Sequence, residues 1–180
     1  RATIGFEAGE KLKDLASFPK NLEKVLKVVP STFSRSSLTV LAVGGGSIGD
    51  FAGFVASIWK RGVSLVHIPS TWLSAFDSAH GGKTALNFSG IKNQFGTFYS
   101  AEAIFIAQDL LQSLPARELK SAAGELAKAA VIDRDVATLL AETELKTFDA
   151  FWKMLPAVIE AKYKIVDEDP REEKGLRQIL

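Results

Sequence analysis

One short stretch constrains the fold of this chain most: the glycine-rich turn VGGGSIGD at residues 43–50. It follows the apolar run LTVLA and places Gly44, Gly46 and Gly49 in the order Gly-x-Gly-x-x-Gly. A helix is expected from about Asp50 to Lys60, and VSLVHI then reads as a buried strand. Strand, glycine turn, helix and strand within about 30 residues make a βαβ unit. The continuous apolar run LTVLAV is typical of a strand covered on both faces.

Glycines at this spacing let the backbone approach a pyrophosphate, and the following helix N-terminus favours negative charge. The alternative is a turn needed only for close packing of helix on strand. A dinucleotide-binding unit of the usual kind has an acid about 20 residues further on, but that place reads VHIPSTW here. The turn therefore favours a nucleotide site without the usual ribose clamp. Asp50 is either a charge favoured by the helix dipole or a ligand-binding residue.

Composition excludes several classes of protein. The 180 residues carry 22 basic and 21 acidic side chains, a net charge of +1 that gives no electrostatic case for nucleic acid or an anionic membrane. There is no cysteine, so disulfides and thiolate metal sites are excluded. The apolar runs are too short to span a bilayer and no signal peptide is evident, so a cytoplasmic protein is the default expectation.

The character of the chain changes along its length. Residues 74–100 are rich in Gly, Ser, Asn and Lys and show little periodicity, which predicts a long irregular segment of the kind that is usually functional. AIFIAQ reads as another strand, and from Pro115 onward the composition is helical. We expect an α/β domain over 1–112 and an all-helical domain over 113–180.

Charged side chains in three places could bind a ligand. Lys83 in DSAHGGKT and Lys92-Asn93 nine residues later favour an anion pocket over a solvated loop, because two such sites share one irregular segment. Glu125 and Lys128 share a helix face, as a surface ion pair or with Glu125 as a metal ligand. His67 is expected in the core, and His80 is left open.

These pieces together resemble the sugar-phosphate cyclases, and within them the 3-dehydroquinate synthase family. The matching stretches, in order, are GEKLK (9–13), GGGSIGDFAGFVASIWKRGV (44–63), IPSTWLSAFDSAHGGKTALN (68–87), KNQFGTFY (92–99), LQSLPARELKSAAGELAKAAVI (111–132) and DEDPREEKGLR (167–177). The run from Asp77 to Thr84, followed by Lys92-Asn93 and by LPARE, is more specific to that family than the glycine turn.

The resemblance implies a Rossmann-like α/β domain that binds NAD and a helical domain that binds Zn²⁺ or Co²⁺, with the active site between them. Implied cofactor contacts are Glu10, Lys13, Gly45, Gly46, Ser47, Asp50, Ser70, Thr71, Leu73, Asp77, Ser78, Lys92 and Ser113. Implied substrate contacts are Asp50, Arg61, Lys83, Lys92 and Asn93, with Arg61 acting from the partner subunit of a homodimer. Implied catalytic residues are Asp77, Lys83, Lys128, Lys162 and Arg177, and Glu125 is the implied metal ligand.

The implied reaction converts a seven-carbon keto-acid phosphate by transient oxidation, phosphate elimination, reduction and aldol closure of a carbocycle. The family's other two zinc ligands are histidines expected beyond Leu180, and a strand region is expected ahead of residue 9. We therefore expect a fragment that is inactive by itself. Four residues depart from the family pattern: Ser70, Ala79, His80 and Gly124.

Three alternatives remain open at this point. Another cyclase of the same fold could make an aminocyclitol precursor or a valiolone. A metal- and NAD-dependent polyol dehydrogenase would not need the phosphate-binding lysines. A truncated remnant could bind NAD without catalysis.

Overall fold

The βαβ unit is present, and its helix begins at the glycine turn itself. The computed structural model describes residues 1–30 and 32–180. Strand β1 (Thr39–Gly44) leads through Gly45 into helix α2 (Gly46–Ile58), and β2 (Ser64–Pro69) then pairs with β1 in parallel. The helix starts four residues earlier than expected, because Gly45 is its N-cap and Gly46 lies in its first turn.

The parallel sheet has the order β1-β2-β5, with β5 at Ala103–Ile104. Both connections move across the sheet in the same direction, so right-handed crossovers place both on one face. Small side chains of α2, among them Ala52 and Ala56, pack on Ala42 and Leu65 of that face.

The expectation that β1 is covered on both faces is wrong within the described residues. Leu41 is 56% exposed and Val43 51% exposed, because both point to the face that neither crossover covers. The face of β1 that carries Leu41 and Val43 is therefore open, while Val66 and Ile68, their partners on β2, are partly buried.

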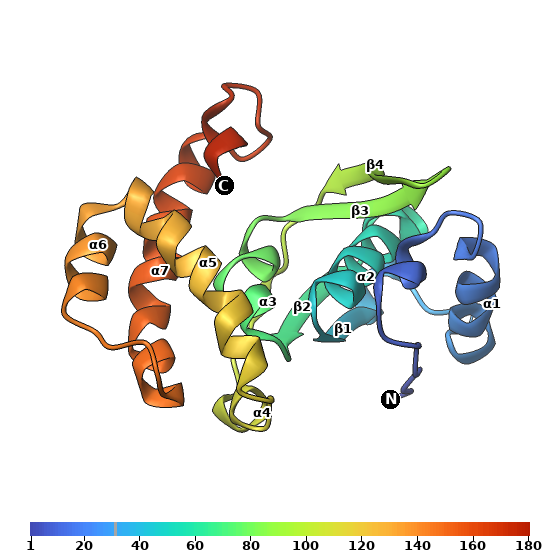
Figure 1. Ribbon diagram of the computed structural model, residues 1–180. Coiled ribbons are helices and arrows are strands. Elements are labelled where there is room, and N and C mark those ends of the chain that lie inside the picture. The colour runs from blue at the N-terminus through green and yellow to red at the C-terminus, as the bar shows by residue number, and fades with distance from the viewer. Residues whose placement is uncertain (31) are drawn as a thin grey trace.

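Residues 74–100 are more regular than the sequence predicted. They contain the end of α3 (Trp72–Phe76), a 3₁₀ turn (Ser78–His80) and an antiparallel hairpin of β3 (Lys83–Phe88) and β4 (Ile91–Phe98). Glycine marks a close approach of strands here, because a Cβ on Gly96 would collide with the Thr84 carbonyl. Helix α2 lies between this hairpin and the parallel sheet, as Figure 1 shows.

The N-terminal segment adds a 3₁₀ turn (Glu10–Lys13) and helix α1 (Phe18–Val28) beside α2, and short 3₁₀ turns occur at Arg35–Ser37 and Trp59–Arg61. The C-terminal part contains α4 (Gln108–Gln112), α5 (Arg117–Ile132), α6 (Arg134–Ala141), α7 (Phe148–Glu168) and a 3₁₀ turn (Leu176–Ile179). Among the described helices none is long and apolar enough to cross a membrane.

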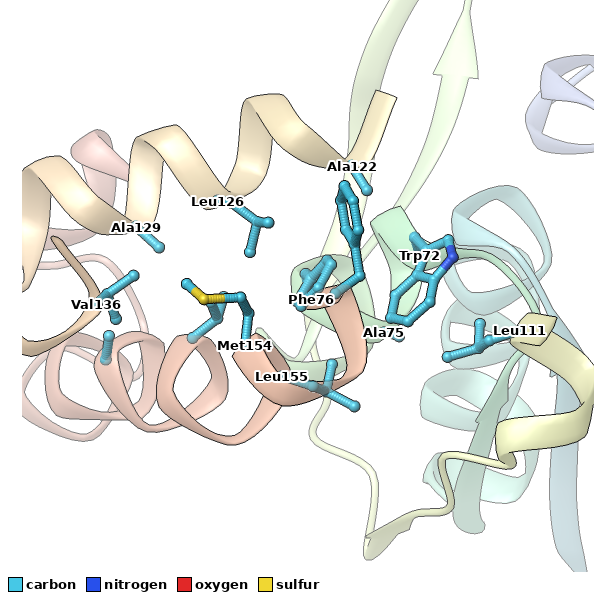
Figure 2. Packing of buried hydrophobic residues seen from close by; sticks show 13 residues of the cluster. Trp72, Ala75, Phe76, Leu111, Ala122, Leu126, Ala129, Val136, Met154 and Leu155 are labelled. Carbon is cyan, nitrogen blue, oxygen red and sulfur yellow. The ribbon is translucent and has the colours of Figure 1, made fainter. Parts of the chain in front are cut away.

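Helix α3 joins the two parts of the molecule. Trp72 and Phe76 stack on each other and are buried in one apolar cluster with Leu126 of α5 and Met154 of α7 (Figure 2). This cluster draws residues from both sides of the expected boundary near residue 112, and the division into two domains stays a prediction.

Two interior helix glycines offer a matched stability test. A Cβ on Gly124 of α5 would meet nothing within 4 Å, so Gly124→Ala should raise the free energy of unfolding by about 1 kcal/mol through helix propensity. A Cβ on Gly53 of α2 would lie 2.6 Å from Cγ2 of buried Thr84, so Gly53→Ala should lower it by about 1–2 kcal/mol. Urea denaturation of both variants measures the two effects, and equal shifts of one sign would contradict the packing described.

Candidate functional site

A cradle of glycines and hydroxyls forms where α2 begins. A Cβ on Gly45 would lie 3.0 Å from Cγ2 of Thr71, and one on Gly46 would lie 3.3 Å from Oγ of Ser78. The Ser78 hydroxyl is buried and has no hydrogen-bond partner among the described residues. Thr71 is otherwise engaged, because its hydroxyl accepts the Ser74 N–H at 3.2 Å. First-turn N–H groups and one free hydroxyl beside bare glycines suit the oxygens of a phosphate.

A buried ammonium organises a second group of residues next to the cradle. Lys13 is 4% exposed, and its Nζ lies 2.7 Å from Asp50 Oδ2 and 2.6 Å from Asn93 Oδ1. Glu10 is further away, 3.5 Å from the same Nζ. Burial raises the pKa of Asp50, and Lys13 opposes that rise. The polar group thus brings together residues from the N-terminal turn, α2 and β4.

Asn87 belongs to this group, although the sequence reasoning missed it. Its Nδ2 donates to Glu10 Oε1 at 2.8 Å and its Oδ1 accepts the Asn93 N–H at 2.9 Å. No sequence signal marked it, because asparagine is ordinary in an irregular segment, and only the structure shows that Asn87 lies in β3, where asparagine is depleted.

A second charged cluster lies between α3, α5 and α7. The Lys162 ammonium contacts Asp77 Oδ1 and donates to the Asp77 carbonyl at 2.6 Å. Lys128 lies 3.7 Å from Asp77 Oδ1 and pairs with Glu125. Burial lowers the pKa of Lys162, while the neighbouring Asp77 carboxylate opposes that shift. These side chains line a cavity of about 20 Å³, which has room for a water molecule.

The C-terminal turn docks beside this cluster through Arg177. Its guanidinium is 2% exposed, donates to the carbonyls of Gly81 at 2.6 Å and Pro170 at 2.7 Å, and lies over Phe98. Its Nε is buried without a partner among the residues the structure describes. Nearby, Lys83 Nζ pairs with Glu172 Oε2 at 2.6 Å.

The remaining implied residues are less closely tied to these groups. Ser47 Oγ lies 3.4 Å from Glu10 Oε2, and the Ser70 N–H donates to Gly44 beside the cradle. Leu73 and Lys92 are exposed. Arg61 lies in an exposed turn with φ 66°, and the Ser113 hydroxyl donates to the Leu110 carbonyl at the end of α4.

A metal site does not form from the described part of the chain. It holds no group of three or more His, Cys, Asp or Glu placed to bind an ion. Glu125, the implied ligand, is paired with Lys128 instead. A zinc site needs three or four ligands, so these residues do not fit a zinc ion without further ligands.

His80, left open by the sequence, is a buried residue of the turn after Asp77. Its Nε2 lies 2.7 Å from the Ala75 carbonyl, its ring meets Tyr163 edge-on, and Nδ1 has no partner among the described atoms. Chiefly because burial disfavours the imidazolium, the pKa of His80 is lowered to about 4.

This burial predicts a pH dependence of stability. The unfolded histidine has a pKa of about 6.5, above the folded value, so the contribution of His80 is complete above that pH and is lost as the pH falls toward about 4. His80→Gln keeps a donor for the Ala75 carbonyl but does not titrate. As the pH falls from about 6.5 to below about 4, the free energy of unfolding of wild type should decrease by on the order of 3 kcal/mol more than that of His80→Gln. Urea denaturation at several pH values measures the difference, and parallel curves would contradict a buried neutral imidazole.

Comparison with known proteins gives consistent results. The family model described as "3-dehydroquinate synthase N-terminal" matches residues 3–121. The 3-dehydroquinate synthase of Sulfurisphaera tokodaii is 38% identical over 169 residues, 89% of this chain and 48% of the relative. That of Campylobacter concisus is 38% identical over 178 residues, 98% of this chain and 50% of the relative. The chain thus spans about half the length of the curated relatives it matches.

Solved structures show the same α/β fold. A 2-deoxy-scyllo-inosose synthase complexed with carbaglucose-6-phosphate, NAD⁺ and Co²⁺ has a TM-score of 0.80 and 30% identity, covering 95% of this chain and 48% of that one. The 2-epi-5-epi-valiolone synthase from Streptomyces hygroscopicus, with NAD⁺ and Zn²⁺ bound, has a TM-score of 0.80 and 25% identity, covering 94% and 48%. An iron-containing alcohol dehydrogenase from Thermotoga maritima, with a TM-score of 0.61 and 21% identity over 87% of this chain and 50% of that one, shares the fold alone.

Proposed function

Because the chain belongs to the 3-dehydroquinate synthase family, we propose that it supplies the NAD-binding part of a 3-dehydroquinate synthase. The reaction would convert 3-deoxy-D-arabino-heptulosonate 7-phosphate to 3-dehydroquinate and phosphate, as a step in aromatic amino acid biosynthesis. The observation that carries the cofactor proposal is the cradle at Gly45 and Gly46, with the unpartnered Ser78 hydroxyl beside it.

The cradle would hold the pyrophosphate of NAD at the N-terminus of α2. Glu10, whose Oε2 faces Ser47 in the first turn of that helix, would accept a ribose hydroxyl. It would replace the acid that is missing after β2. Ser70, Thr71, Leu73 and Ser113 complete the proposed contacts. Bound NAD would supply reversible hydride transfer, which leaves the net reaction redox-neutral.

The substrate would bind between the cradle and the charged cluster of α3, α5 and α7. Lys83, Lys92 and Asn93 would hold its phosphate, with Arg61 of a partner subunit in a cytoplasmic homodimer. Asp50, Lys128 and Arg177 would bind its hydroxyl and carboxylate groups. The contact between Asp77 and the buried Lys162 would hold or release a proton, because the pKa of Lys162 is lowered by burial.

Zinc or cobalt enters this proposal through Glu125 alone. The described residues do not complete a site around it, so we assign no chemical step to a metal. That the chain by itself has no turnover stays a prediction.

Another sugar-phosphate cyclase is the second candidate, supported by 30% identity to the 2-deoxy-scyllo-inosose synthase structure. The higher identity of 38% to 3-dehydroquinate synthases favours the first. A polyol dehydrogenase would have no use for a phosphate group at Lys83, and an NAD-binding remnant would bind cofactor without the heptulosonate phosphate. Titration of the chain with NAD and, separately, with the heptulosonate phosphate distinguishes a cyclase from a polyol dehydrogenase and from an NAD-binding remnant.

Cofactor binding at the cradle is tested with a glycine pair. Gly46→Ala places a methyl group 3.3 Å from Ser78 Oγ, in the space proposed for the pyrophosphate. We expect the Kd for NAD, measured by calorimetry, to rise about tenfold or more, which corresponds to ~1.4 kcal/mol. Gly124→Ala, where a Cβ meets nothing within 4 Å, is the matched control. Absence of NAD binding by wild type would refute the cofactor proposal.

Phosphate binding at Lys83 is tested through its ion pair with Glu172. A phosphate must replace the Glu172 carboxylate at the Lys83 ammonium, so Glu172→Gln should lower the Kd for the heptulosonate phosphate severalfold and Lys83→Met should raise it. Glu144→Gln, which breaks the exposed pair with Lys146, serves as the charge-matched control. Equal affinities of wild type and both Lys83-pair variants would show that the phosphate binds elsewhere.

A further inference from the structure

We propose that Asn87 is a positioning residue that couples Glu10 in the cofactor pocket to Asn93 in the substrate pocket. The inference rests on the proposed function for the roles of those two residues. Asn87 itself would touch neither ligand.

The contacts of Asn87 fix the orientation of its amide. Nδ2 faces the Glu10 carboxylate, which can only accept, and Oδ1 faces the Asn93 N–H, which can only donate. A flipped amide would lose both hydrogen bonds. The side chain is 5% exposed, so water cannot readily replace either partner.

The backbone of Asn87 adds a third link. Its carbonyl accepts the Leu15 N–H at 2.8 Å, which ties the segment after Lys13 to β3. Asn87 thus holds the Glu10 side chain and the backbone after Lys13 against β3, while Lys13 itself also bonds Asn93 of β4.

The effect on Glu10 is to select one carboxylate orientation. With Oε1 bound by Asn87, Oε2 faces Ser47 at 3.4 Å, beside the glycine cradle. Burial alone would raise the pKa of Glu10, but the Asn87 hydrogen bond and the charges of Lys13 and Lys92 outweigh it, and the pKa is lowered. What the Asn87 contact adds is the fixed orientation of this carboxylate, which is 43% exposed and can accept a hydroxyl donor.

The effect on Asn93 is to support an unusual backbone. Asn93 has φ 56°, beside an irregularity in the β3–β4 pairing, and its N–H is held by Asn87. That conformation directs the Asn93 amide oxygen to Lys13 at 2.6 Å. The contacts close a ring through Glu10, Asn87, Asn93 and Lys13, so a change at Asn87 reaches both pockets.

A donor–acceptor exchange tests this coupling. Asn87→Asp sets a carboxylate against Glu10, so the Kd for NAD at pH 8 should rise about tenfold or more and should fall again as the pH is lowered. In Asn87→Asp/Glu10→Gln the glutamine amide donates to the new aspartate and leaves its oxygen toward Ser47. This double variant should bind NAD more tightly than either single variant, a rescue that loss of packing alone cannot produce. Asn21→Asp, which adds the same charge on α1, should bind like wild type.

A second measurement separates the inference from the proposed function. The ionisation of the Glu10 carboxyl group is followed by carbon-13 NMR in a pH titration without ligand. Asn87→Asp should raise the pKa of Glu10, while Asn21→Asp should leave it unchanged. No NAD binding by wild type would refute the cofactor proposal only. Additive losses in the double variant, or an unchanged Glu10 pKa in Asn87→Asp, would overturn the coupling. If Asn87→Asp fails to fold but the double variant folds, this rescue of folding supports the coupling. If Asn87→Asp, the double variant and Asn87→Ser all fail to fold, Asn87 is only structural and the inference falls.

Discussion

The candidate site depends on one buried charge, the ammonium of Lys13. An ammonium at 4% exposure is costly unless polar partners replace its water. Those partners are Asp50 from α2 and Asn93 from β4, with Glu10 from the same turn. Three elements that are far apart in sequence therefore have to meet at one atom. This requirement places the N-terminal turn over the start of α2, where the glycine cradle lies.

The second charged cluster is positioned by apolar packing instead. Trp72 and Phe76 bury the short helix α3 in the core of α5 and α7 (Figure 2), and Asp77 follows at the end of that helix. The carboxylate is thereby delivered to Lys162, which projects from the same face of α7 that the core covers. Hydrophobic contacts thus hold together charges whose own pairing would be a weak source of stability.

The sequence predicted local features better than features that depend on several segments. The strand–glycine–helix order was clear because each part has its own residue signature, and the α/β fold is confirmed. The open face of β1 was missed because an apolar run does not show which crossovers will cover it. The β3–β4 hairpin was missed because Gly96, Asn87 and Asn93 read as loop residues, although here they allow close strand contact and an internal polar network. Asn87 became visible only when both of its partners were placed beside it.

Three of the cations proposed for the substrate site already face a protein carboxylate. Lys83 meets Glu172, Lys128 meets Glu125, and Lys162 meets Asp77. Binding of an anionic ligand is then an exchange of one oxygen partner for another, rather than a simple gain of Coulomb energy. The exchange is easiest at the half-exposed Lys83 and hardest at the buried Lys162, because an ammonium left briefly unpaired is better solvated near the surface. This order supports the proposal that the phosphate binds at Lys83 on the hairpin and that the partly buried Asp77–Lys162 contact handles a proton.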